Sequence, residues 1–330
     1  MPLTMKDIAR MVGVSESTVS RAINGKPGVG KETREKILAL VKKYQYQPNT
    51  LAKGLASQKT RTLGLIIPDI TYPYLTRIVK GIEERANELG YHLILANTGG
   101  NRDKEISYLS LFQQNRVEGI IFVGGSLAEE EIIKLGLNKY PLVLVNKLME
   151  ELALPTLLID HQQGAELAIT HLIERGHQRI GMVVGSLDDL TNFQLLEGYK
   201  EALKQSNLPF LKNMVVEVED SRQGGYNGFL KLIEEENLPS AIFAASDLLA
   251  VGVVEAIKMG GYLIPDEIAV VGYGDTLITE IIHPPLTTIR LPLSELGKRA
   301  IDRLVKVIEK TKIEEPFEIL TSKLIRRHST

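Results

Sequence analysis

The pattern of apolar and polar positions changes near residue 61. From Thr62 onward, short apolar runs alternate with longer amphipathic stretches. The runs that we expect to be buried strands are Leu63–Ile67, His92–Ala96, Gly119–Val123, Leu142–Val145, Leu157–Ile159, Ile180–Val184, Ala241–Ala244 and Ile268–Val271. The stretches with helical spacing are Pro73–Leu89, Lys104–Gln114, Gln162–Arg175, Asn192–Gln205, Gly225–Glu236, Asp247–Met259 and Ser294–Glu309. Parallel strands with helical crossovers produce this alternation, so the pattern predicts an α/β body.

The predicted units fall into two sets that join near Pro155–Asp160. We therefore expect two doubly wound parallel-sheet lobes with a cleft between them. Ligands of open α/β sheets bind beyond the carboxyl ends of the strands. The segments that follow the strands are the candidate edges of the cleft: Asp69–Tyr74, Asn97–Asn101, Asn146, Asp160, Ser186–Asn192, Ser246–Asp247 and Asp275.

Before residue 62 the pattern predicts a small all-α head. Met5, Ile8, Ala9 and Val12 recur at i, i+3, i+4 and i+7, which places them on one face of a helix. Thr4 can cap the start of this helix together with an acidic residue three positions later.

A second short helix is expected to begin at Ser15, a residue type that caps helices well. Its apolar face holds Val19, Ala22 and Ile23, and its polar face holds Ser17, Ser20, Arg21 and Asn24. A short helix with a polar face that carries an arginine fits a DNA major groove. The alternative is a small helical hairpin with a solvated face, and spacing alone favours DNA only slightly.

The third expected helix is Lys31–Tyr44, with Ile37, Val41 and Tyr44 facing inward. A further short helix over Thr50–Ala56 and a basic linker would follow it. Gly25–Lys31 matches most of a phosphate-binding loop, but Glu32 replaces the required Ser or Thr and no buried strand precedes it. We interpret this segment as the turn into the third helix.

Charge separates the same two parts of the chain. Residues 1–61 hold 12 Lys and Arg against 4 Asp and Glu, a formal charge of +8. The other 269 residues hold 27 against 37, a formal charge of −10. A basic head on an acidic body is typical of a protein that binds nucleic acid through the head.

Composition argues against several other classes of protein. The chain has no Cys, and its six His residues show no metal-binding spacing, so we expect no metal site and no cofactor. No catalytic motif assembles a nucleophile, a base and an oxyanion donor, so we expect no catalytic residues. Neither a signal sequence nor a membrane-spanning run is apparent, which leads us to expect a soluble, cytoplasmic protein without a membrane partner.

Motifs along the whole chain carry a resemblance to one family. The head reads MKDIARMVGVSESTVSRAINGKPGVGKETREKILALVKKYQYQPNTLAKGL, and the body contains LGLIIPDI, HLIERGHQRIGMVVG, GYKEAL, PSAIFAASDLLAVG, IPDEIAVVGYGD and PPLTTIR. With these motifs the chain resembles the lactose-repressor/galactose-repressor family of bacterial transcription regulators over essentially its full length.

The resemblance implies a helix-turn-helix head over 1–46, a hinge helix and linker over 47–61, and an effector-binding and dimerisation body over 62–330. The body would resemble a periplasmic sugar-binding protein, with one lobe of about 62–157 and 291–320 and the other of about 161–286 and 321–330. It further implies a homodimer on double-stranded operator DNA, acting as a repressor of a carbohydrate-catabolism operon. A small-molecule effector (a sugar, sugar phosphate or other metabolite) or a protein co-regulator would control operator affinity.

The family's DNA-contacting positions can be placed on this sequence. Arg21 matches the recognition-helix arginine, and its guanidinium can pair with guanine O6 and N7 or contact phosphate alone. Glu16 and Ser17 occupy the positions that vary between operators. Phosphate contacts or caps are expected from Ser15, Thr18, Ser20 and Asn24, and Thr4 completes the set in the head. In the hinge, Ala52, Lys53 and Leu55 would meet the minor groove, where a leucine can wedge into a base step or pack on its dimer mate. We expect residues 49–56 to be ordered only in a dimer on DNA.

The effector site departs from the family's sugar-binding pattern. Leu195 stands where sugar-binding relatives usually have Arg, Gly274 where they have Asp or Asn, and Asp220 where they have an aromatic residue. We therefore expect weak binding of simple monosaccharides. The candidate effector contacts are Tyr72, Tyr74, Asn97, Asn146, Asp160, Asn192, Asp220, Asp247 and Asp275. Asp247 and Asp275 have an alternative structural role, which we favour for Asp247 because Ser246-Asp247 opens a helix.

Two other classes of protein compete with a regulator. A soluble binding protein or transporter component would share the body, but the basic head argues against it. An enzyme on an α/β body would need a catalytic constellation that the sequence does not supply.

Overall fold

The computed structural model describes residues 4–44, 46, 60–149, 151–234 and 238–330. The chain forms two compact units, Met1–Arg61 and Thr62–Thr330, which are described separately. Residues 47–59 of the expected hinge helix and linker, with Ala52, Lys53 and Leu55, lie outside the described residues.

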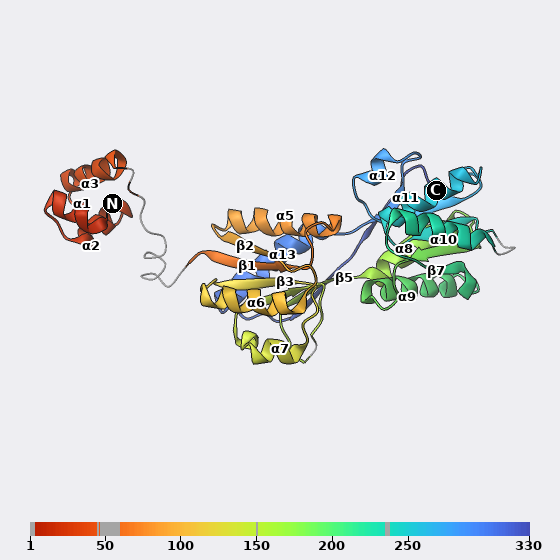
Figure 1. The fold of residues 1–330 in the computed structure, drawn as a ribbon, viewed down its shortest axis with the longest axis horizontal. Helices are drawn as coiled ribbons and strands as arrows, with labels where there is room; N and C mark the ends of the chain where they lie inside the picture. The colour runs from red at the N-terminus through yellow and green to blue at the C-terminus, as the bar shows by residue number, and fades with distance from the viewer. Residues whose placement is uncertain (1–3, 45, 47–59, 150, 235–237) are drawn as a thin grey trace. The chain divides into compact units, whose positions relative to one another are not determined.

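The head is built from three helices, α1 (Met5–Val12), α2 (Glu16–Ile23) and α3 (Lys31–Lys43) (Figure 1). Their shared core consists of Ile8, Ala9, Val19, Ala22 and Ile37, all at most 5% exposed. Gly13 adopts φ 74° between α1 and α2, a left-handed conformation that favours glycine. The segment before α3 is a turn, as the sequence predicted.

One inward position of the third helix was predicted wrongly. Tyr44 is 46% exposed, whereas Tyr46 packs against the core of the head. The helix ends at Lys43 with Tyr44 as its C-cap, so the expected helical spacing no longer applies at this position.

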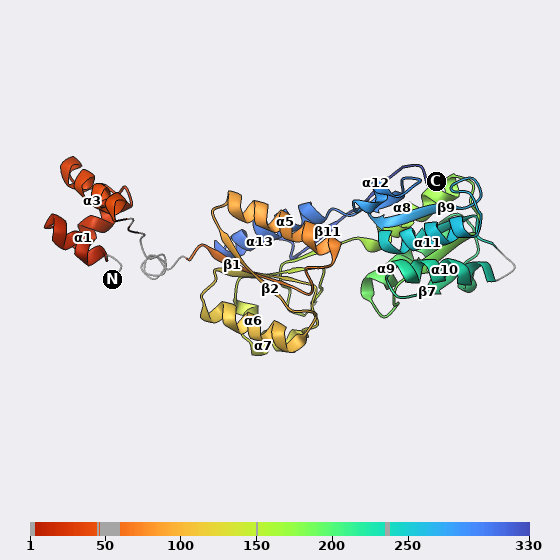
Figure 2. The ribbon, with the colours of Figure 1, turned by 45° about the horizontal axis from the view of Figure 1, so that its top comes forward.

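The body consists of two lobes, each built around a six-stranded sheet (Figures 1 and 2). The first sheet has the order β11-β5-β4-β3-β1-β2 and pairs only in parallel among the described residues. Its strands are β1 (Thr62–Ile67), β2 (His92–Asn97), β3 (Gly119–Val123), β4 (Leu142–Val145), β5 (Thr156–Ile159) and β11 (Phe317–Leu320). The helices of this lobe are α5 (Pro73–Glu88), α6 (Arg102–Gln114), α7 (Glu129–Lys134) and α13 (Leu293–Ile308), with the 3-10 turn η1 (Leu137–Lys139).

The second sheet has the order β12-β10-β9-β8-β6-β7, and only its β10–β12 pair is antiparallel in the described chain. Its strands are β6 (Ile180–Val184), β7 (Val215–Glu217), β8 (Ala241–Ala244), β9 (Ala269–Gly274), β10 (Thr287–Arg290) and β12 (Lys323–Ile325). The helices of this lobe are α8 (His161–Glu174), α9 (Leu190–Gln205), α10 (Arg222–Glu234), α11 (Asp247–Met259) and α12 (Ile278–Ile281), with the 3-10 turn η2 (Lys212–Met214). Both lobes are thus the doubly wound α/β units that the apolar runs predicted.

The chain crosses between the lobes after β5, after β10 and after β11. Each crossing joins a strand of one sheet to an element of the other lobe. The carboxyl ends of the parallel strands therefore lie close to the segments about which the lobes can turn.

Candidate nucleic-acid interface and effector site

The start of α2 is fixed by hydroxyl groups. Ser15 Oγ accepts a hydrogen bond from the Thr18 amide at 3.2 Å, which caps the helix as predicted. The same oxygen lies 2.7 Å from Ser17 Oγ and 2.9 Å from Thr18 Oγ1. These three hydroxyls hold one another at the amino end of the helix, where backbone N–H groups and the helix dipole favour an anion such as phosphate.

The polar face of α2 is displayed by the core beneath it. Val19 and Ala22 are buried, while Ser17, Arg21 and Asn24 are exposed and Ser20 is half-buried. Asn24 Nδ2 donates to the Ser20 carbonyl oxygen at 2.8 Å, which closes the end of the helix. Arg21 has no hydrogen-bond or ion-pair partner among the described residues, and its guanidinium lies near Gly28. Its donors are therefore available to a ligand outside the head.

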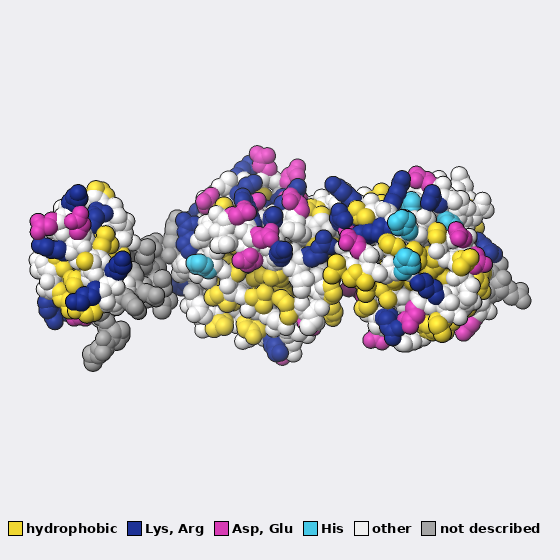
Figure 3. All heavy atoms as spheres, turned by 90° about the horizontal axis from the view of Figure 1, so that it is seen from above, with side chains coloured by type: hydrophobic (Ala, Val, Ile, Leu, Met, Phe, Trp, Pro, Cys, Tyr) yellow, Lys and Arg dark blue, Asp and Glu magenta, His cyan; other side chains and the backbone are white. Residues whose placement is uncertain are grey.

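Thr4, another residue expected to contact DNA, also caps a helix. Thr4 forms a reciprocal capping box with Asp7, in which each side chain accepts from the backbone amide of the other residue. Glu16 is exposed at the first position of α2. Figure 3 shows several Lys and Arg side chains on the face of the head that is in view.

In the first lobe, two tyrosines lie at the start of α5, Tyr72 as its N-cap and Tyr74 in its first turn. The Tyr72 and Tyr74 rings are stacked with centroids 6.1 Å apart and planes inclined by 16°. Both side chains are exposed, and such rings can stack on a flat apolar face of a ligand. Asn97 Oδ1 accepts from the Ile70 amide at 3.0 Å, so Asn97 ties the end of β2 to the loop after β1.

Asn146 follows β4 and adopts φ 51°. Its Oδ1 is buried and has no hydrogen-bond partner within the described chain. An unsatisfied buried carbonyl oxygen costs free energy, and a donor supplied by a ligand or by water would recover it. Asn146 therefore remains a good candidate for an effector contact.

In the second lobe, the predicted residues fix strand-end loops. Asp160 caps α8 by accepting from the Gln163 amide at 2.9 Å. Asn192 Nδ2 donates to the Ser186 carbonyl oxygen at 3.0 Å, and Asp220 Oδ1 accepts from Ser246 Oγ at 2.5 Å. Asn192 and Asp220 each link two consecutive segments at the carboxyl ends of this sheet.

Asp247 is a structural residue in this geometry. It is 2% exposed, and its Oδ2 accepts from the Thr276 amide and hydroxyl at 2.7 and 2.9 Å. Its Oδ1 accepts from Thr288 Oγ1 at 2.7 Å. Burial raises the pKa of this carboxyl group, and the hydrogen bonds from Thr276 and Thr288 oppose that shift. This arrangement favours the structural alternative over an effector contact.

Asp275 is likewise ion-paired within the protein, which favours the structural alternative for this residue too. Its carboxylate forms ion pairs with Arg290 and with Arg327, the latter at 2.8 Å. Burial would raise its pKa, but the two guanidinium groups outweigh burial and hold the pKa below its usual value. Asp275 anchors a turn with φ 53° rather than presenting an unpaired charge.

Tyr74 of the first lobe lies near two carboxylates of the second lobe, those of Asp189 and Asp220. Although Tyr74 is 41% exposed, its pKa is raised to about 12, first by the partial burial of its side chain and then by the charges of Asp189 and Asp220. Asp189 also caps α9, and sequence reasoning placed it only within a candidate edge of the cleft. Arg77, one turn beyond Tyr74 on α5, donates a hydrogen bond to the Asp275 carbonyl oxygen. This residue was not found from the sequence, because nothing there relates it to Asp275.

Two of the residues that depart from the family's sugar-binding pattern, Leu195 and Gly274, have packing roles in the second lobe. Leu195 is fully buried in the core of the second lobe. Gly274 adopts φ 133°, and a Cβ at this position would lie 3.1 Å from Asp247 Oδ2. Neither position supplies a polar side chain to a ligand.

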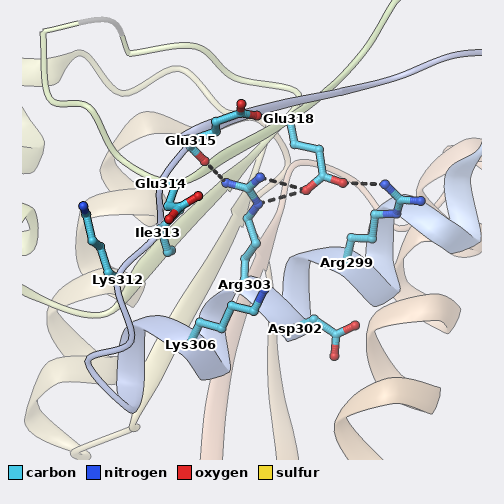
Figure 4. Close-up of a pocket in the computed structure, with 9 residues that line it drawn as sticks. All are labelled: Arg299, Asp302, Arg303, Lys306, Lys312, Ile313, Glu314, Glu315 and Glu318. Atoms are coloured by element: carbon cyan, nitrogen blue, oxygen red, sulfur yellow. Dashed lines mark hydrogen bonds and ion pairs between the residues drawn. The ribbon is translucent and has the colours of Figure 1, made fainter.

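A separate pocket of ≈ 540 Å³ lies between α13 and the segment that leads into β11. Figure 4 shows Arg299 and Arg303 pointing toward Glu318, and their guanidinium nitrogens lie 2.5 and 2.9 Å from its carboxylate oxygens. Arg303 also donates to the Glu315 carbonyl oxygen. These ion pairs tie α13 to β11, and none of the predicted site residues lines the pocket.

Two absences apply to the part of the chain that the structure describes. No group of three or more acidic or histidine side chains there is arranged to hold a metal ion. No helix there has the length and apolarity that crossing a membrane requires.

Comparison with known proteins agrees with this two-part arrangement. Residues 4–49 match the family model described as bacterial regulatory proteins, lacI family, and residues 60–326 match the model for periplasmic binding proteins and the sugar-binding domain of the LacI family. Catabolite control protein A of Priestia megaterium is 35% identical, and the match covers 100% of both chains. The ribose operon repressor of Haemophilus influenzae is 34% identical over 93% of this chain and 92% of its own. The solved lac repressor dimer bound to operator and the anti-inducer ONPF is similar with a TM-score of 0.88 and 26% identity, covering 100% of this chain and 99% of that chain.

Proposed function

The chain belongs to the LacI family of bacterial regulatory proteins, and from that premise we propose that it is a dimeric repressor of a carbohydrate-catabolism operon. The coarser function follows from the family itself: the chain is a DNA-binding transcriptional regulator with an effector-binding body, in a branch concerned with carbohydrate-related regulation. We further place it in the cytoplasm, where its operator would be.

The observation that carries the proposal is the exposed polar face of α2. Arg21 stands on this face without a partner in the described chain, next to Ser17 and above a packed apolar core. A guanidinium so placed can donate two hydrogen bonds to guanine O6 and N7. The hydroxyls at the amino end of the same helix would set the register of the helix through phosphate contacts.

A second copy of the chain would cover an apolar edge of the body. Strand β2 is the edge of the first sheet, and its Ile94 and Leu95 are 44% and 40% exposed. Figure 3 shows hydrophobic side chains gathered on the surface of this lobe. An exposed apolar edge strand pairs readily with another chain, and a twofold dimer protects both edges at once. Two heads in one dimer would then meet two half-sites about one helical turn apart.

Effector control would act through the angle between the lobes. The residues of the first lobe best placed to touch an effector are Tyr72, Tyr74 and Asn146, and Tyr74 lies near Asp189 and Asp220 of the second lobe. We assign the lobe arrangement seen here to the DNA-binding state, since the similar lac repressor structure described above is an operator-bound dimer. A protein co-regulator acting on the same equilibrium is the alternative to a small molecule.

Selection from random duplexes with the full chain tests the proposal. It should recover one pseudo-palindromic sequence, and binding to that sequence should weaken steeply with added salt because the head is basic. Recovery of no preferred sequence would reject the function.

A further inference from the structure

A hydrogen bond joins the two lobes in addition to the crossing segments. Arg77 lies on α5 of the first lobe, and its Nη1 donates to the Asp275 carbonyl oxygen at 3.0 Å. The same nitrogen lies 3.4 Å from the Gly274 carbonyl oxygen. Both acceptors belong to the turn that ends β9 in the second lobe.

The turn that receives Arg77 is held rigidly by its own lobe. The Asp275 side chain is ion-paired with Arg290 and Arg327, while the amide of the next residue, Thr276, donates to buried Asp247. Gly274 adopts φ 133°, and a Cβ there would lie only 3.1 Å from Asp247 Oδ2. The carbonyl oxygens of this turn are therefore fixed acceptors.

The same turn contacts the segment that crosses between the lobes after β10. Arg290 is the last residue of β10, and the chain crosses from it into α13 of the first lobe. Asp275 therefore contacts both segments. Its carboxylate is ion-paired with Arg290 at the end of β10, and its carbonyl oxygen accepts a hydrogen bond from Arg77 of α5. A change in the angle between the lobes must alter the Arg77 contact, because its donor and its acceptors belong to different lobes.

The position of Arg77 also relates it to the candidate effector contacts. Tyr74 precedes Arg77 by three residues, which places both on one face of α5. On that face, Tyr74 lies near the charges of Asp189 and Asp220, and Arg77 contacts the turn after β9. A molecule that packs on Tyr74 would share this face with Arg77.

We propose that Arg77 is a latch between the lobes, which stabilises the arrangement seen here through the carbonyl oxygens of Gly274 and Asp275 and is released when an effector changes the angle between the lobes. The coupling to DNA rests on the proposed function, whereas the latch itself does not. An element of this kind biases an equilibrium only by its different contacts in the two states. The arginine is thus a positioning residue.

The first test measures the distance between the lobes in the full chain. The sequence has no Cys, so Lys104→Cys on α6 and Lys204→Cys on α9 give two exposed sites for spin labels. Arg77→Met keeps the aliphatic part of the side chain and removes the donors, and Lys80→Ala removes an exposed charge one turn along the same helix. Arg77→Met should shift or broaden the distance distribution, whereas Lys80→Ala should leave it as in the unsubstituted chain. Identical distributions for both variants would overturn the proposal.

The second test measures operator affinity without effector. Arg77→Met should weaken binding to the selected duplex by at least about fivefold, the lower end of ordinary allosteric coupling, with an unchanged melting temperature. A shifted distance with unchanged affinity would overturn the regulatory role. If the unsubstituted chain prefers no duplex at all, the proposed function fails, and the distance measurement still decides whether the latch exists.

Discussion

His161 Nδ1 and the Tyr273 hydroxyl lie 2.7 Å apart in the second lobe, joining the first turn of α8 to β9. Burial lowers the pKa of His161 from 6.5 to about 4, although the charges of Asp189 and Asp160 act in the opposite direction. The imidazole is therefore neutral in the folded protein at neutral pH.

This relationship predicts a pH dependence of stability. Between about pH 6.5 and 4 the unfolded chain binds a proton at this histidine that the folded chain does not, so stability falls as pH falls through this window. The full contribution is on the order of 3 kcal/mol. His161→Gln should flatten the dependence of the free energy of unfolding on pH in this range, as measured by urea denaturation. His92→Gln, at an exposed position, is the control, and equal slopes for the two variants would contradict the assignment.

Arg21→Ala should abolish the preference for operator over random duplex while leaving the dimer intact. Each half-site loses one bidentate base contact, worth about 1–3 kcal/mol of discrimination, so a dimer on two half-sites loses about 2–6 kcal/mol. Fluorescence anisotropy on both duplexes measures it, and sedimentation measures the dimer. Lys36→Ala removes an exposed charge from α3 and should retain the preference. Unchanged discrimination in Arg21→Ala would show that its guanidinium contacts phosphate alone.

Leu95→Lys should dissociate the dimer. The substitution places a charge on the exposed apolar edge formed by β2, and burying that charge against a second copy would be unfavourable. Sedimentation at several concentrations should show a dissociation constant raised at least about tenfold, with operator affinity falling in parallel. Lys104→Glu, on the exposed part of α6, is the comparison. A dimer as tight as the unsubstituted one would place the interface elsewhere.

Gly297→Ala should destabilise the first lobe. Alanine in the interior of a helix usually adds about 1 kcal/mol of stability relative to glycine. Here a Cβ would lie 2.3 Å from the Ile78 carbonyl oxygen, because α13 and α5 cross at Gly297 and Gly81. The expected result is a loss of about 1–3 kcal/mol by chemical denaturation. Lys298→Ala, at the next position, should change stability by less than about 1 kcal/mol; a stabilised Gly297→Ala would refute the close crossing.

Simple hexoses should bind weakly or not at all, as the sequence led us to expect. Leu195 is part of the buried core and Gly274 offers only a carbonyl oxygen, which Arg77 already contacts. Leu195→Arg should therefore lower the melting temperature rather than create a sugar site. Calorimetry with a monosaccharide panel checks this expectation, and micromolar binding of a common hexose would overturn it.

The sequence predicted most of the fold because its buried parallel strands are nearly continuous apolar runs. The strands β7, β10, β11 and β12 were missed. They are three or four residues long, and most of them mix polar with apolar residues. Tyr44 was placed inward by helical spacing, which stops applying once α3 ends.

The candidate site was predicted less completely, for a related reason. Residues that follow strands were found from the pattern, but their partners depend on contacts between distant segments. Nothing near Asp275 in the sequence indicates that Arg327, 52 positions later, pairs with its carboxylate. The structural role of Asp247 was anticipated because a helix begins there, whereas its bond to Thr288 was not.

The most direct test of the account is the affinity of the full chain for its selected duplex and for a scrambled duplex of equal length, measured at several salt concentrations. We predict a ratio of at least about 10³ in favour of the selected duplex, and an affinity that falls steeply with salt on both. Equal affinities for the two duplexes would contradict the claim that the exposed face of α2 reads DNA sequence.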